Sequence, residues 1–177
     1  MRGREKLSPT MEKPEGGKSF PALLCSALGI LLILGVIALL LPSVLPPLLG
    51  IRVCNVLSGS MEPAIPVGSM IFVRPAEAEE IGEGEVIAFS RDGVVVAHRV
   101  AENRRLEKRF VTKGDANAAA DREKVPYDEM LGAVVLCVPT LGALTACLTT
   151  PPGKAFLFAL ILCGLLLNVI AARLRGQ

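Results

Sequence analysis

Residues 85–100 read EVIAFSRDGVVVAHRV, and this stretch indicates the fold class. Valine occurs on both sides of Arg91-Asp92-Gly93, with isoleucine and phenylalanine before the turn, and such β-branched and aromatic residues favour extended strands. A short Asp-Gly turn between two such runs is a strong signal for a β-hairpin. The sequence therefore predicts an antiparallel pair of strands at residues 85–90 and 94–100.

Three further β-branched runs lie on either side of this hairpin, at residues 70–74, 109–113 and 130–138. Turns that contain Gly, Asp or Pro separate the runs, and no helical period of comparable strength appears between them. The sequence thus predicts a mainly β fold, with a small and mostly antiparallel domain inside residues 42–150.

Two long apolar runs flank the β region. Phe20–Leu41 contains no charged residue, and at a rise of ~1.5 Å per residue it is long enough to cross a hydrocarbon core of ~30 Å. A cleavable signal peptide is the alternative, but its apolar region is only ~7–15 residues long. We expect the helix to be retained and to end at Pro42, Pro46 and Pro47. Ala155–Ala172 predicts a second span, with a buried core helix as the alternative.

Lysine and arginine near the spans predict their orientation, because these residues are enriched on the cytoplasmic side. Several basic residues precede the first span, and Arg173 and Arg175 follow the second. We expect residues 1–19, a flexible polar tail, and residues 173–177 to be cytoplasmic. Residues 42–150 are then extracytoplasmic.

A third apolar segment, LGALTACLTT at residues 141–150, is too short to span a bilayer. It ends at Pro151-Pro152-Gly153 and leads toward the second span. We expect this segment to lie at the membrane surface.

The composition argues against several function classes. The net charge is +2, Trp is absent and no basic patch is interleaved with aromatics, so we expect no nucleic-acid partner. His98 is the only histidine and no two cysteines have CxxC spacing, so we expect no metal and no cofactor. Cys54 and Cys137 are the two cysteines placed to pair in a water-exposed domain, and the sequence leaves their proximity open.

Three short polar segments carry the candidate chemistry. They are SGSMEP at residues 58–63, His98-Arg99 at the end of a β-branched run, and TKGDAN at residues 112–117 with Asp121 beyond it. Taken singly, the first and third are ordinary turns and the histidine is a structural one. Their combination, in this order and spacing, is the specific signal.

Together these segments resemble the signal peptidase I family, in the class that includes endoplasmic-reticulum, archaeal and some sporulating-bacterial enzymes. The resemblance covers Phe20 to Pro151. It implies a small β-rich catalytic domain tethered to a membrane, here by one N-terminal and one C-terminal transmembrane helix. It also implies a membrane-bound serine endopeptidase that cleaves N-terminal signal peptides from exported preproteins after small residues.

The resemblance assigns roles to five residues. Ser60 matches the nucleophile, and His98 occupies the place where the common bacterial class carries a lysine base. Asp115 and Asp121 match the two acidic positions of the serine–histidine class. Ser58 matches a hydroxyl that helps to line the oxyanion hole.

Elementary chemistry agrees with these roles. A serine hydroxyl is a weak nucleophile until a base removes its proton, and a neutral imidazole, with an ordinary pKa near ~6.5, can act as that base. An aspartate behind the imidazole fixes its tautomer. We favour Asp121 for this role, because the small side chains at residues 118–120 let the loop pack closely, and expect Asp115 to hold the loop through turn amides. Both assignments stay open at this point.

Two functions of other kinds compete. A non-catalytic membrane subunit would need neither serine nor histidine, and self-cleaving regulatory proteases usually pair serine with lysine beside a DNA-binding domain. The joint presence of Ser60, His98, Asp115 and Asp121 argues against both. The expected partners are signal peptides, bound by strand addition, the lipid bilayer and the protein export machinery. The expected location is the plasma membrane rather than the endoplasmic reticulum.

Overall fold

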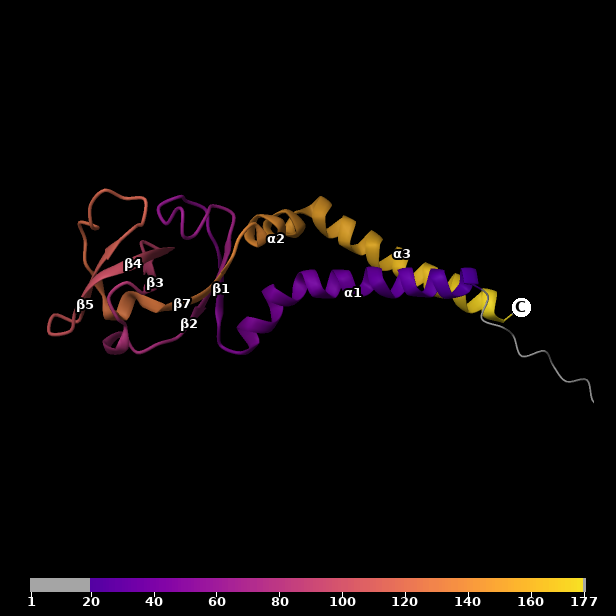
Figure 1. Cartoon of the computed structure of the whole chain (residues 1–177), viewed down its shortest axis with the longest axis horizontal. Helices are drawn as coiled ribbons and strands as arrows, with labels where there is room; N and C mark the ends of the chain where they lie inside the picture. The colour runs from indigo at the N-terminus through magenta and orange to yellow at the C-terminus, as the bar shows by residue number, and fades with distance from the viewer. Residues whose placement is uncertain (1–19, 177) are drawn as a thin grey trace, which may run out of the picture. The chain divides into compact units, whose positions relative to one another are not determined.

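The computed structural model describes residues 20–176 and divides into two compact units. One unit holds residues 20–35 and 159–176, and the other holds residues 36–158, which include all the strands (Figure 1). The tail predicted at residues 1–19 and the last residue, Gln177, lie outside the described residues.

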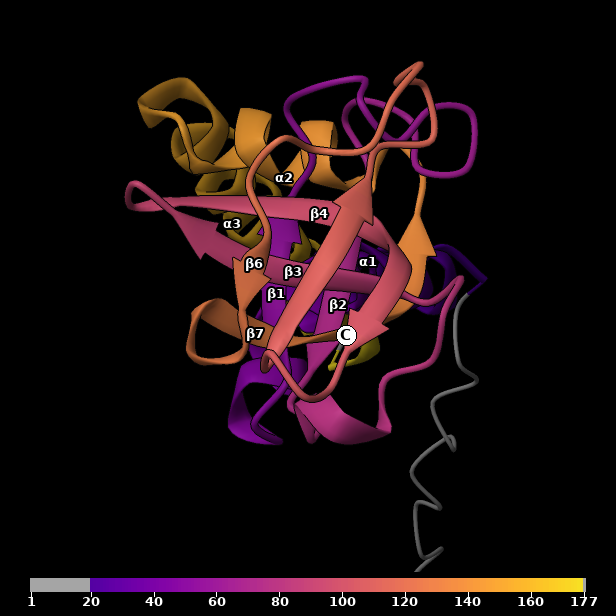
Figure 2. The same ribbon diagram turned by 90° about the vertical axis from the view of Figure 1, so that its left-hand side faces the viewer.

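The second unit is built on one sheet of seven strands in the order β1-β2-β7-β3-β4-β5-β6, and neighbouring strands are antiparallel (Figure 2). The strands are β1 (Arg52–Asn55), β2 (Met70–Arg74), β3 (Val86–Arg91), β4 (Val94–Arg104), β5 (Arg109–Lys113), β6 (Val125–Pro126) and β7 (Met130–Val138). The prediction of a mainly β, antiparallel domain between two apolar helices is confirmed. The sequence reading missed β1 and β6.

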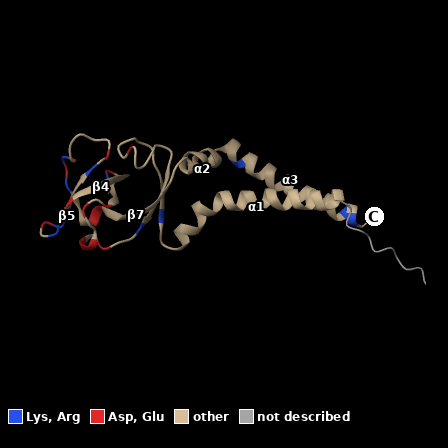
Figure 3. Cartoon of the chain, in the orientation of Figure 1, with Lys and Arg blue, Asp and Glu red and all other residues tan. Residues whose placement is uncertain are grey.

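Three α-helices and two short 3-10 helices complete the chain. They are α1 (Phe20–Leu48), α2 (Leu141–Thr149), α3 (Pro151–Arg175), η1 (Ala78–Glu80) and η2 (Tyr127–Glu129). The most apolar windows of α1 and α3 have mean hydropathies of 2.9 and 2.6, and 11% of each window is buried. α1 carries no charged residue, and the charges of α3 lie near its two ends (Figure 3). Long apolar helices that leave their side chains uncovered are suited to a lipid environment.

The end of α1 corrects the sequence reading. The helix continues through Pro42, Pro46 and Pro47 to Leu48, where the sequence predicted an end at Leu41. The stop comes from Gly50, whose φ is +76°. Its amide donates to the Pro47 carbonyl at 3.1 Å, and the Ile51 amide donates to the Pro46 carbonyl at 3.0 Å. This hydrogen-bond pair is a Schellman motif, so a left-handed glycine ends the helix.

The start of α3 also differs from the prediction, because Pro151 begins the helix that was expected at Ala155. Thr150 caps it, since the Thr150 hydroxyl accepts a hydrogen bond from the Gly153 amide at 3.2 Å. Proline is favourable at the first helical position, where its missing N–H would have no partner. The Pro-Pro-Gly sequence therefore starts a helix here instead of forming a loop.

The first unit pairs α1 with α3 through small residues. A Cβ atom on Gly29 would lie 2.6 Å from the Gly164 carbonyl oxygen, and one on Gly164 would lie 2.9 Å from the Gly29 oxygen. The Ser26 hydroxyl donates to the Asn168 side-chain oxygen at 3.3 Å, and the Asn168 amide donates to the Gly164 carbonyl at 2.9 Å. Close backbone approach at small residues, with polar groups across the contact, is typical of helix pairs in membranes.

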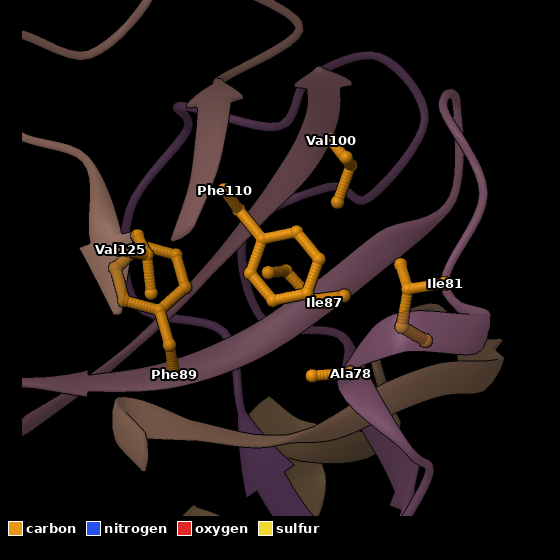
Figure 4. Packing of buried hydrophobic residues seen from close by; sticks show 7 residues of the cluster. All are labelled: Ala78, Ile81, Ile87, Phe89, Val100, Phe110 and Val125. Carbon is orange, nitrogen blue, oxygen red and sulfur yellow. The ribbon is translucent and has the colours of Figure 1, made fainter. Parts of the chain in front are cut away.

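The sheet is covered on both faces, and β3 shows why. Ile87 and Phe89 point into one apolar cluster, whereas Ala88 between them belongs to the other. The first cluster contains Ala78, Ile81, Ile87, Phe89, Val100, Phe110 and Val125 (Figure 4). The second contains Met61, Ile65, Ile71, Val73 and Ala88. Alternate residues of one strand therefore face two cores, and this explains the continuous apolar run in the sequence.

The structure also settles the spacing of Cys54 and Cys137, which flank Ile71 on the two strands next to β2. Two strand spacings separate them by roughly 9.5 Å, beyond the Cα separation that a disulfide bridges. All five cysteines are free, so no disulfide cross-links the described residues.

Candidate active site

Ser60 lies in the turn between β1 and β2, and the residues that follow it anchor this turn. Met61 and Ile65 are 2% and 4% exposed and belong to the second apolar cluster. The Ile65 amide donates to the Met61 carbonyl at 2.9 Å, and the Glu62 amide donates to the Gly59 carbonyl at 3.1 Å. The apolar positions of the motif therefore fix the backbone that carries Ser60.

His98 lies on β4 directly opposite Ile87 of β3, so its ring shares the face of the first apolar cluster. The residue is 8% exposed, and the edge of its ring meets Phe89 with the centroids 6.2 Å apart. Its Nε2 lies 3.1 Å from the Ser60 hydroxyl oxygen. The central hairpin thus brings the single histidine against the serine of the SGSMEP segment.

Asp121 binds the other ring nitrogen of His98. The distance from Nδ1 to Oδ2 of Asp121 is 2.6 Å, and the Asp121 amide donates to the Thr112 carbonyl at 2.8 Å. A carboxylate only accepts hydrogen bonds, so Nδ1 carries the proton. The unprotonated Nε2 then accepts the hydrogen bond of the Ser60 hydroxyl.

Asp115 lies against Arg99 instead. The Arg99 guanidinium donates two hydrogen bonds to this carboxylate, from Nε at 2.8 Å and from a terminal nitrogen at 2.6 Å. These bonds hold the pKa of Asp115 below its usual range. We expected Asp115 to hold its loop through turn amides, but its side-chain partner is a guanidinium on β4. Two parallel bonds from a cationic guanidinium bind a carboxylate more strongly than single bonds from turn amides, which explains the difference.

The loop after β5 also contacts the backbone of Ser60. The Ala116 amide donates to the Ser60 carbonyl at 2.9 Å, and a Cβ atom on Gly114 would lie 2.6 Å from that oxygen. Gly114 is therefore a glycine because the backbone of Ser60 passes too close for a side chain. Sequence analysis named Thr112 and Gly114 only as members of the TKGDAN segment and gave neither a role. In the structure the Thr112 hydroxyl donates to Asp121 at 2.6 Å.

Ser58 is exposed and lies with Ser60 on the wall of one cavity. The cavity has a volume of about 220 Å³. Its walls are residues 54–58, Ser60-Met61, Ile65, Ile71 and Val94–Ala97. Among the backbone hydrogen bonds of residues 20–176, none is donated by the Ser60 amide. The structure thus places Ser58 and Ser60 on one small, largely apolar cavity.

The edge of β4 borders the same cavity. Residues 94–99 pair with β3, and pairing with β5 begins only at Arg99. In the described sheet, Val94–Ala97 therefore present unpaired backbone groups on one side. Such an edge can accept an extended peptide through main-chain hydrogen bonds.

No family model matches the chain. Comparison with individual known proteins finds relatives that are named as signal peptidases. Signal peptidase I W of Bacillus subtilis is 40% identical over 84 residues, 45% of this chain and 44% of that protein. The signal peptidase complex catalytic subunit SEC11 of Pyricularia oryzae is 32% identical over 109 residues, covering 55% and 63%. The human SEC11C subunit is 38% identical over 72 residues, 38% of each chain.

The chain thus spans about half the length of the curated relatives it matches. These relatives come from a bacterium, a fungus and a mammal, and each is named as a signal peptidase or its catalytic subunit. The two apolar helices, which precede and follow the strands in the sequence, fit a protein held in a membrane. The relatives and the fold together support membership of the signal peptidase I family.

Proposed function

We propose that the protein is a membrane-bound serine endopeptidase that removes signal peptides from exported preproteins after small residues. Ser60 is the nucleophile, His98 the general base, and Asp121 the residue that orients the base. The observation that carries this proposal is the continuous hydrogen-bonded line from the Ser60 hydroxyl through both ring nitrogens of His98 to Asp121. Nucleophile, base and orienting carboxylate at such distances define a serine protease site.

This chain of hydrogen bonds gives the order of proton transfers in the proposed reaction. The Ser60 oxygen attacks the scissile carbonyl carbon while Nε2 of His98 takes the hydroxyl proton. The peptide C–N bond then breaks, and the imidazolium gives that proton to the leaving amine. Water repeats the sequence on the acyl-enzyme and releases the carboxylic acid. Asp121 stays ionised throughout and stabilises the imidazolium.

The oxyanion that forms in each addition step needs hydrogen-bond donors. The Ser60 amide and the Ser58 hydroxyl, on the wall of the cavity that Ser60 lines, supply them. One such donor is typically worth ~2.7–4 kcal/mol of barrier. Ser58 is exposed, so its hydroxyl contributes less than the fixed backbone amide.

The cavity supports the preference for small residues. The cavity volume is only about 220 Å³ and its walls include the apolar residues Ile65 and Ile71, which favours small side chains. The substrate adds as a strand along Val94–Ala97, which brings the residue before the cleaved bond to Ser60. Signal peptides arrive as extended segments leaving the bilayer, so this binding mode suits them.

The proposed location is the plasma membrane, with the β unit on the extracytoplasmic side and the protein export machinery as a partner. The basic residues Arg173 and Arg175 at the end of α3 support this orientation. An impermeant thiol reagent tests it on intact cells. A cysteine introduced at Asp92, in a cysteine-free background, is labelled if the β unit is outside and stays unlabelled if it is cytoplasmic.

Cleavage of a synthetic preprotein by the purified full chain tests the function. The matched substrate carries alanine at the positions one and three residues before the bond, and the control carries leucine at both. Mass spectrometry should find one cut after alanine in the first and none in the second. Equal cleavage of both, or of neither, contradicts the proposal.

A further inference from the structure

A second cavity lies between the segment that contains η1 and the hairpin formed by β4 and β5. It has a volume of about 680 Å³, and its walls are Ile81-Gly82-Glu83 and residues 102–107. None of these residues lines the cavity of Ser60, which β4 borders through Val94–Ala97. The second cavity is therefore separate from the proposed peptidase site.

The Asn103 side chain ties the two walls of this cavity together. Its amide nitrogen donates to the carbonyls of Ala78 at 3.0 Å and Ile81 at 2.8 Å. Its oxygen accepts a hydrogen bond from the Tyr127 hydroxyl at 2.5 Å. Ile81 is 3% exposed and belongs to the first apolar cluster. Because one wall is anchored in the core and bonded to the other, the cavity is preformed.

Leu106 stands at the tip of the hairpin with a relative exposure of 102%. Arg104 donates to Glu102 at 2.9 Å and to Glu107 at 3.2 Å, and Lys124 donates to Glu107 at 2.7 Å. A single exposed leucine is ordinary on a protein surface. Leu106 differs because a network of ion pairs braces its turn and because it lies at the cavity that it helps to line.

Opposite charges gather on the two walls. Residues 77–85 carry five exposed glutamates and no lysine or arginine, whereas residues 104–109 carry four cationic side chains and one carboxylate. Both signs of charge appear at the β5 end of the second unit in Figure 3. Glu83 and Arg105 are exposed on the cavity walls, and among the ion pairs within residues 20–176 none includes either. The surface thus offers one charge of each sign to a partner.

We propose that this surface binds the same surface of a second copy of the chain, in a twofold symmetric dimer. Leu106 of each copy fills the cavity of the other, and Arg105 of each copy pairs with Glu83 of the other. A twofold interface requires one self-complementary patch. An apolar tip, a cavity and two opposite charges side by side meet this requirement, whereas an acidic or a basic foreign surface would match only one wall.

The dimer goes beyond the proposed function and does not depend on it. The two cavities share no lining residue, so the contact leaves the Ser60 cavity of each copy open. Two copies held in one bilayer by α1 and α3 have a higher effective concentration than free proteins, so that an interface of modest size is sufficient.

Charge reversal tests the contact between Arg105 and Glu83. Arg105→Glu and Glu83→Arg each place like charges against one another in the dimer, so each should weaken dimerisation roughly tenfold. The double variant R105E/E83R restores opposite charges at both contacts and should recover the wild-type dissociation constant. Leu106→Asp should weaken the dimer at least as much as a single reversal. Glu129→Arg is the matched control, because this glutamate is exposed on η2 and lies outside the cavity walls.

Sedimentation of the purified full chain in detergent, over a series of concentrations, gives the dissociation constant of each variant. The melting temperature of each variant checks that it is folded. A second measurement uses membranes that contain two differently tagged, otherwise cysteine-free copies, one with Leu106→Cys and one with Gly82→Cys. No atom lies within 4 Å of a Cβ added at Gly82, so a thiol fits there. Oxidation should join the two tags, and Glu129→Cys in place of Gly82→Cys should give no product.

Dimers that both single reversals weaken and the double variant restores, together with the cross-link through Gly82→Cys, support the proposal. A chain that is monomeric at all concentrations, a double variant no tighter than the single ones, or the absence of a cross-link between the two tags overturns it. A cross-link from Leu106→Cys to a different protein also overturns it, since the occupant is then not a second copy. Failure of the wild-type chain to cleave the preprotein would instead contradict the proposed function and leave the dimer standing.

Discussion

Thr112 and His98 bind the same oxygen of one carboxylate: the Thr112 hydroxyl and Nδ1 of His98 each lie 2.6 Å from Oδ2 of Asp121. Thr112 is fully buried on β5, directly opposite Val100 of β4. The carboxylate that orients the imidazole is therefore itself held from a strand of the sheet. This arrangement places the rigid part of the site in the sheet and leaves only the Ser60 turn and the loop after β5 outside it.

Asp121→Asn should fold normally and lose kcat by a factor on the order of 10² to 10⁴. An amide can present its NH₂ group to Nδ1, which favours the tautomer with the proton on Nε2, and that nitrogen then cannot accept the Ser60 proton. Steady-state cleavage of the preprotein measures the loss. Asp128→Asn on η2 is the control, since it removes one exposed carboxylate outside the site. Near-wild-type kcat for Asp121→Asn would remove Asp121 from the mechanism.

Gly114→Ala should lower activity strongly, because its Cβ would meet the Ser60 carbonyl oxygen at 2.6 Å and push the backbone of Ser60 away. Crowding of this kind typically costs ~1–3 kcal/mol of stability. Gly82→Ala is the matched control, since no atom lies within 4 Å of its added Cβ. Melting temperature and kcat together test the prediction. Equal activities of the two variants would show that the loop yields without disturbing Ser60.

Asp115 makes the stability of the β unit depend on pH. Its pKa is lowered first by the hydrogen bond from Arg99, so the ionised form stabilises the folded state. The contribution is complete above the unfolded value of ~3.9 and is lost as the pH falls through the lower folded value. Both side chains are partly exposed, so a difference of ~2–4 °C between wild type and Asp115→Asn is expected at pH 7. Thermal melts from pH 7 to pH 2.5 should show this difference shrinking only below about pH 4. A constant difference would contradict the ion-pair account.

The close contact between α1 and α3 in the first unit predicts which glycine of these apolar helices cannot be enlarged. Gly164→Val should weaken the contact of α3 with α1, because even a Cβ at this position meets the Gly29 oxygen at 2.9 Å and the Ile33 side chain. Gly35→Val on α1 is the control, with nothing within 4 Å of its added Cβ. Disulfide formation between cysteines placed at Ser26 and Asn168, in a cysteine-free background, reports the pairing. Cross-linking should fall for Gly164→Val alone, and an equal yield in both backgrounds would speak against the contact.

The sequence was sufficient to predict the central strands, because β-branched runs and the Asp-Gly turn act locally. Residues 70–74, 109–113 and 130–138 are strands with the predicted bounds. β1 was not predictable in this way, since Arg52–Asn55 has only a short apolar centre and is extended because it pairs with β2. β6 has two residues and exists only as a partner of β5. Such short strands depend on tertiary pairing, which local propensity does not contain.

The contacts of the candidate site, like the strands, were only partly predictable from the sequence. The motif spacing pointed to Ser60, His98 and Asp121, and the structure brings these three side chains within hydrogen-bonding distance. The partner of Asp115 was not predictable, because Arg99 becomes its neighbour only when the loop folds back on β4. The same holds for Thr112, whose hydroxyl is aimed at Asp121 by its place in the sheet. Contacts between segments distant in sequence therefore account for what sequence reading missed.

The central claim is that Ser60 attacks the substrate, and preprotein cleavage by a Ser60→Ala variant tests it most directly. The variant should fold and bind substrate, because Met61 and Ile65 still anchor the turn, but it should show no measurable cleavage. Ser90→Ala, at the end of β3, is the matched control and should cleave at the wild-type rate. Loss of cleavage in Ser60→Ala alone is the predicted result. Cleavage by purified Ser60→Ala at the wild-type rate would contradict the account.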